Sequence, residues 1–268
     1  MGQYFYTEVV ILRTMENIWA AYKMKCETSF IQRSGTIVCG ATQQIDIDDI
    51  YQKAEFVSEH EGRVAFLYAL IMMYHKQPFT VRSGSVSECL RHVFWLLSHD
   101  IGEIASGDQP DDGTFGHSDA RAKEDRIFNE FFDYLPGEDR SWFERTHDSF
   151  ESYGGTVETQ FDKALDKVEA ILYLLFLREK GIEGDVMKKN PPSRQDVKLA
   201  KLLGTSNTSD VWCLHMRIKI KQMNPKIIDV LDGLLVAAFS DIYRAEIIAN
   251  GDKLPKCLTM DVTNLRLD

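Results

Sequence analysis

Residues 87–103 read SECLRHVFWLLSHDIGE and decide the fold of this chain. Apolar side chains recur in this stretch at steps of three and four residues, at Leu90, Val93, Phe94, Leu96 and Leu97. That spacing places them on one broad face of an α-helix. The same period runs through most of the chain, while alternating strand patterns are almost absent. The sequence therefore predicts an all-α fold.

The expected helices are long, and several of them are strongly apolar. From their periodicity they cover residues 9–25, 58–75, 87–98, 118–134, 139–152, 157–180 and 227–250. Ser58 is the predicted N-cap of the second helix. Between residues 181 and 194, Gly184 and the pair Pro191-Pro192 interrupt the helical pattern. We therefore expect one domain over residues 1–184 and a helical extension over residues 185–268 that packs on the same unit.

Composition and charge exclude several classes of protein. The 268 residues are 44% hydrophobic and 27% charged, as in ordinary globular proteins. The net charge of −10 argues against nucleic acid as a partner, because such binding needs clustered Lys and Arg. Five scattered cysteines without CxxC spacing indicate reduced thiols, and no apolar run approaches the roughly 20 residues that cross a membrane. We expect a cytoplasmic protein without a membrane partner.

Ionisable residues stand out on three of the apolar helices. His60 lies near the start of one, His99-Asp100 at the end of another, and Asp166 within a third. Burying such groups is costly unless they satisfy one another. Two imidazoles and two carboxylates suit one divalent transition metal ion (Mn, Co, Fe, Ni or Zn), with positions left for a water and a phosphoryl oxygen. The alternative is that His99 is a core histidine and Asp100 a capping residue.

Three motifs carry a resemblance to a known family. They are residues 55–60, residues 99–110 with the pattern HDxxExxxGDxP, and residues 161–169, and Lys123-Glu124 and Leu135-Pro136 lie between the last two. The chain resembles the HD-domain superfamily of metal-dependent phosphohydrolases. Within it, the chain is similar to the HD-domain 5′-deoxynucleotidases, both the bacterial nucleotidase and the HD-domain-containing protein 2 group. The resemblance covers residues 55–178 and implies an HD-domain helical bundle.

The resemblance also implies roles for individual residues. It implies that the metal ligands are His60, His99, Asp100 and Asp166. It further implies that Glu103 and Asp108 line the reaction site near the attacking water and the leaving oxygen. A carboxylate at Glu103 can orient and deprotonate the water, and Asp108 can help to supply the leaving-group proton. A solvated carboxylate at Glu103 and a turn residue at Asp108 are the structural alternatives. Asp162 competes with Asp166, because residues four apart share a helix face, and we prefer Asp166 because it aligns with the third motif.

The chain departs from these nucleotidases before the first histidine. The family carries an Arg-Trp pair there, whose Arg binds the 5′-phosphate and whose Trp helps to reject a 2′-hydroxyl. Here residues 32–34 are Gln-Arg-Ser. Arg33 is a candidate phosphate clamp, since a guanidinium offers two parallel donors, and an exposed loop arginine is the equal alternative. Without the Trp, selectivity for deoxyribose stays open.

Together these features predict a hydrolase. We expect a metal-dependent phosphomonoester hydrolase, 5′-nucleotidase-like, that acts on a nucleoside monophosphate or a similar small phosphorylated metabolite by attack of a metal-activated water. A non-catalytic HD module that binds metal or nucleotide for regulation is the alternative, and a metal-free helical interaction protein is a third hypothesis. The resemblance also implies a homodimer.

Overall fold

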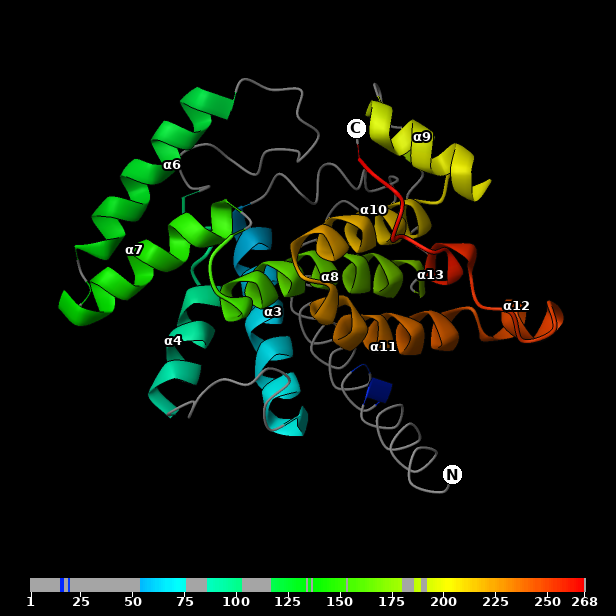
Figure 1. Cartoon of the computed structure of the whole chain (residues 1–268), viewed down its shortest axis with the longest axis horizontal. Helices are drawn as coiled ribbons and strands as arrows, with labels where there is room; N and C mark the ends of the chain where they lie inside the picture. The colour runs from blue at the N-terminus through cyan, green and yellow to red at the C-terminus, as the bar shows by residue number, and fades with distance from the viewer. Residues whose placement is uncertain are drawn as a thin grey trace, which may run out of the picture. The chain divides into compact units, whose positions relative to one another are not determined.

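The computed structural model describes residues 15, 16, 19, 54–75, 86–102, 117–133, 135, 137–152, 154–179, 186–188 and 192–267 (Figure 1). This part of the chain contains ten α-helices and one short 3₁₀ helix, and no β-strand. The prediction of an all-α fold is therefore confirmed. None of the described helices combines the length and the hydropathy that a membrane-spanning segment needs.

The chain divides into two compact units, and two long helices pass from one into the other. What we call the central unit holds α3 (Ala54–His75) as far as Ala69, then α4 (Val86–Leu96), α6 (His117–Phe132), α7 (Gly137–Glu151) and the start of α8 (Val157–Glu179) as far as Lys163. The C-terminal unit holds the end of α3, α8 from Ala164 onward and the helices that follow it. The domain boundary expected at residue 184 stays a prediction.

The central unit is built around an aromatic core. Its helices are α3 (Ala54–His75), α4 (Val86–Leu96), α6 (His117–Phe132), α7 (Gly137–Glu151) and the first turns of α8 (Val157–Glu179). Trp95 of α4 is fully buried. The rings that surround Trp95, with centroids 5.4 to 6.3 Å away, are Phe128, Phe143, His147 and Phe150. These packed rings contribute much of the burial that holds α4, α6 and α7 together.

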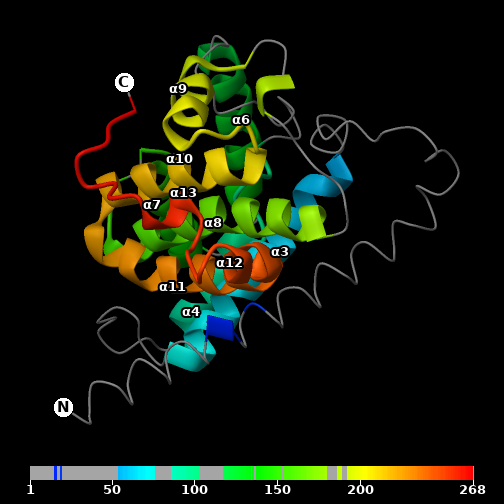
Figure 2. The ribbon, with the colours of Figure 1, turned by 90° about the vertical axis from the view of Figure 1, so that its right-hand side faces the viewer.

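The C-terminal unit is a set of shorter helices around α10. They are η1 (Val186–Lys188), α9 (Arg194–Leu203), α10 (Thr208–Met223), α11 (Pro225–Ile242), α12 (Arg244–Ala249) and α13 (Lys256–Thr259). Helix α10 contacts α9, α11 and α13 (Figure 2). Residues 171–177 of α8 are all buried, which requires neighbours on every side of the helix. Arg178 at the end of α8 donates to the Tyr243 hydroxyl, and its guanidinium lies over that ring.

Two details of the expected helices are wrong. Helix α3 begins at Ala54, so Ser58 lies inside the helix and is not its N-cap, because no helix-breaking residue precedes it. The helix expected over residues 227–250 is interrupted at Tyr243, whose φ of −95° and ψ of 15° leave the helical region. Its hydroxyl donates to Asp210 at 3.3 Å, so a tertiary contact accompanies the break. Of residues 9–25, only Met15, Glu16 and Trp19 are described, and these three are helical.

Candidate metal centre

His99 and Asp100 lie in the turn that follows α4, and backbone contacts fix the His99 ring. The helix ends at Leu96 and the chain turns through residues 97–102. His99 Nδ1 lies 3.0 Å from the Leu96 carbonyl oxygen, and a carbonyl oxygen only accepts, so Nδ1 carries the proton. The lone pair of the neutral ring is then on Nε2, the tautomer that a metal-binding histidine uses. The ring is 2% exposed, so water does not compete for this arrangement.

His60 and Asp100 lie against His99 inside the central unit. His60 comes from the second turn of α3, and its ring centroid is 5.6 Å from that of His99. One oxygen of Asp100, Oδ2, lies 3.3 Å from His99 Nε2 and 3.7 Å from His60 Nε2. Two imidazole nitrogens and a carboxylate oxygen therefore face one small volume. This donor set suits a divalent transition metal.

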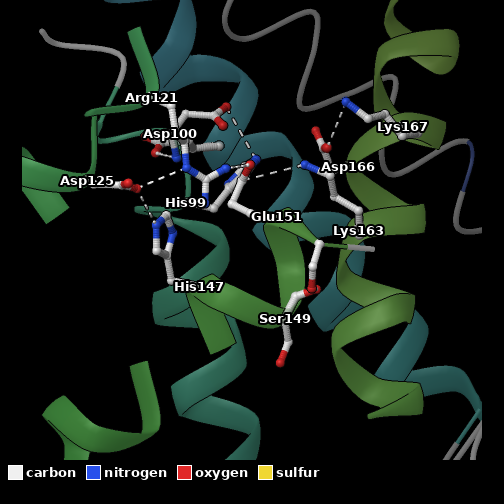
Figure 3. A network of polar contacts seen from close by, with 12 residues as sticks. His99, Asp100, Arg121, Asp125, His147, Ser149, Glu151, Lys163, Asp166 and Lys167 are labelled. Atoms are coloured by element: carbon white, nitrogen blue, oxygen red, sulfur yellow. Dashed lines mark hydrogen bonds and ion pairs between the residues drawn. The ribbon is translucent and has the colours of Figure 1, made fainter. Parts of the chain in front are cut away.

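Asp166 joins this group from α8. Each of His60, His99 and Asp166 offers one ligand atom, and these atoms all lie within 4.8 Å of one another. Ligands of a single ion at about 2.1 Å are roughly 3 to 4 Å apart, so the spacing is close to that of a bound site. Lys167 Nζ lies 3.4 Å from Asp166 Oδ2. Figure 3 shows Asp166 and Lys167 on α8, and His99 and Asp100 at the turn.

The comparison with known families agrees with this geometry. Residues 46–193, more than half of the chain, match the HD-domain family. The chain belongs to the HD-domain family. Proteins of this family are typically metal-dependent phosphohydrolases and bind divalent metals, which fits the donors that converge here. The chain matches no curated protein and no solved structure significantly.

Glu61 is a residue of the HD site that the sequence reasoning missed. It follows His60 on α3, is 8% exposed, and accepts a hydrogen bond from the Asp100 backbone N–H through Oε1 at 3.1 Å. Burial raises the pKa of Glu61 to about 7, against the lowering effect of His99. Glu61 thus ties α3 to the turn that carries Asp100. The available signal was an acidic residue among the apolar positions of this helix.

Asp162, the alternative fourth ligand, is engaged elsewhere in the HD domain. It is fully buried, and its Oδ2 lies 2.6 Å from His92 Nδ1. The His92 ring stacks on Tyr68 and meets the edge of Trp142, with centroids 5.8 and 5.1 Å away. Burial lowers the pKa of His92, but the charge and hydrogen bond of Asp162 outweigh it, so the pKa lies above its ordinary value. Burial raises the pKa of Asp162.

The remaining predicted site residues cannot be placed. Glu103, Asp108 and Arg33 lie outside the described residues, so their roles stay predictions. Within the described part, His60, His99, Asp100 and Asp166 are the predicted site residues that come together. Their role as metal ligands stays a prediction.

Proposed function

We propose that this HD-domain chain is a phosphomonoester hydrolase that acts on a nucleoside monophosphate or a similar small phosphorylated metabolite. The observation that carries the proposal is the convergence of His60, His99 and Asp166, with Asp100 between the two rings. A purely structural metal site would not need the further carboxylates Glu103 and Asp108 close in sequence to its ligands. The resemblance to 5′-deoxynucleotidases supports the nucleotide as substrate.

The metal would be held by His60, His99, Asp100 and Asp166. When bound, a divalent ion lowers the pKa of a water molecule and neutralises negative charge on a phosphoryl group. His99 presents Nε2 because its Nδ1 donates to Leu96. Glu61 holds the Asp100 amide, so the carboxylate of Asp100 stays beside both rings.

Proton transfer and phosphate binding are assigned to residues near this group in sequence. Glu103, three positions after Asp100, would take a proton from the attacking water, and Asp108 would help to protonate the leaving oxygen. Arg33 would contact the phosphate as a bidentate donor. Because the Trp of the deoxynucleotidase pair is missing here, we propose that the ribose is read less strictly than in those enzymes. We further propose a cytoplasmic homodimer.

The decisive experiment combines metal analysis with a substrate screen. The full chain is loaded with Mn, Co, Fe, Ni or Zn, and phosphate release is measured from ribo- and deoxyribonucleoside monophosphates and from sugar phosphates. We expect His99→Ala and Asp166→Asn to lose both metal and turnover. Glu103→Ala should keep the metal and lose about 10²- to 10⁴-fold in kcat.

The screen also has an outcome that rejects the enzyme. Metal-loaded wild-type protein that releases no phosphate from any of these esters would favour the regulatory HD module instead. Protein that binds no divalent metal would remove both hypotheses and leave the helical interaction protein.

A further inference from the structure

A buried lysine lies on α8 one turn before Asp166. Lys163 is three positions ahead of Asp166, so the two side chains leave neighbouring parts of one helix face. The lysine is 8% exposed, which is rare for this residue type because an ammonium loses its hydration on burial. A lysine in this position therefore needs an explanation beyond solubility.

The Lys163 ammonium is held in place by α7. It lies 4.0 Å from the centroid of the Phe150 ring and 3.8 Å from Glu151 Oε1. The other oxygen of Glu151 accepts from Arg121 at 2.8 Å, and Arg121 donates on to Asp125 at 3.0 Å. Figure 3 shows this series of contacts from α6 through α7 to Lys163. Lys163 therefore belongs to a series of charged contacts that links α6, α7 and α8.

The same phenyl ring connects Lys163 to the HD turn. The Phe150 and His99 rings pack at an interplanar angle of 64°, with centroids 5.3 Å apart. Lys163 and His99 thus share one aromatic neighbour, Phe150. Lys163 is therefore a buried cation that shares Phe150 with His99 and precedes Asp166 by three residues on α8. Lysine binds phosphate as a compact point charge.

We propose that Lys163 binds an anionic oxygen of the substrate phosphate beside the metal centre, and that Phe150 and Glu151 position its ammonium. This inference rests on the proposed function, since it concerns the same site and the same class of substrate. It adds a cation from the described part of the central unit to the Arg33 clamp expected from the sequence. Lys163 is a substrate-binding residue in this proposal and does not bind the metal.

The test measures binding of inorganic phosphate, which requires no turnover. The full chain loaded with Mn is titrated with phosphate by calorimetry, as wild type, Lys163→Gln, Lys163→Arg and Lys201→Gln. The last is the matched control, an exposed lysine in α9. We expect Lys163→Gln to keep its metal and to bind phosphate at least about tenfold more weakly, because a charge-assisted hydrogen bond is lost. Lys163→Arg should stay within a few-fold of wild type, and Lys201→Gln should match it.

The outcomes separate this inference from the proposed function. Phosphate binding by Lys163→Gln as tight as that of wild type, at equal metal content, overturns the role of Lys163 whether or not the enzyme turns over. Absence of phosphate binding by the wild type also overturns it. If phosphate binds through Lys163 but no phosphomonoester is cleaved, the inference stands and the proposed function fails. Should Lys163→Gln fold poorly, Lys163→Met keeps the apolar stem and decides the same question.

Discussion

Removing the Asp162 carboxylate should destabilise the protein without removing its metal. His92 is 6% exposed, and its Nδ1 lies 2.6 Å from Asp162 Oδ2. In Asp162→Ala the ring would stay buried without this carboxylate. Breaking one side of a buried pair costs about 3 to 5 kcal/mol. Burial already disfavours the Asp162 charge, as its raised pKa shows, and removing the charge returns part of this cost. We therefore expect a loss of about 3 kcal/mol, a large part of the total stability of a domain.

A double-mutant cycle by guanidinium unfolding measures this pair. His92→Leu with Asp162→Ala removes both polar groups, so the double variant should lose about 1 kcal/mol, less than Asp162→Ala alone. The metal content of each variant is measured beside its stability. Asp166→Asn serves as the reverse control. It should lose the metal, but its stability should be close to that of the wild type when both are measured without metal.

Two results would refute the reasoning. If both single variants unfold within about 0.5 kcal/mol of wild type and their effects add, the pair is not energetically coupled. If Asp162→Ala loses the metal and Asp166→Asn keeps it, the fourth ligand is Asp162, and the preference for Asp166 is wrong.

Three further predictions concern pH, two glycines and the C-terminal extension. The pKa values of His92 and Asp162 are both raised, so the folded state binds more protons than the unfolded state. The stability that this pair contributes should therefore fall as pH rises above 6.5, the ordinary pKa of histidine. Unfolding of the wild type and of the double variant between pH 6 and 8 measures this difference. Gly102→Ala should lower the free energy of unfolding by about 1 to 3 kcal/mol, because the added Cβ would lie 2.7 Å from a ring carbon of Phe128. Gly62→Ala is the control, since its Cβ would meet nothing within 4 Å and the change should be neutral or stabilising. Thermal unfolding measures both variants. Truncation after Lys189 should give poorly soluble protein by light scattering, and a monodisperse, equally heat-stable product would contradict our expectation that the extension packs on the same unit.

Local periodicity was enough to predict the class of the fold and the helices that carry the site. The three- and four-residue spacing of apolar residues around His60, His99 and Asp166 is a local property, and the structure has a helix or its end at each of them. Their approach to within 4.8 Å depends on tertiary packing. Periodicity does not predict that packing, whereas the resemblance implied that these residues meet at one metal.

What the sequence did not predict depends on contacts between distant residues. His92 and Asp162 are 70 positions apart, and no local pattern marks them as partners. The same holds for Glu61, whose partner is a backbone N–H 39 positions away, and for the break at Tyr243, where Asp210 and Arg178 contact the side chain. Helix boundaries at such points follow tertiary contacts and not intrinsic propensity.

Helix α8 makes Asp166 mechanically dependent on the C-terminal helices. Twelve residues, or about 18 Å of helix, separate Asp166 from Arg178, which lies over the Tyr243 ring. The turns between them are buried at residues 171–177, so the helix cannot slide or rotate at one end alone. A substitution that shifts Tyr243 would therefore displace a carboxylate of the metal centre as well. If Asp166 is a metal ligand as proposed, variants of the extension would change metal affinity without contacting the metal, and the extension would hold this ligand in position.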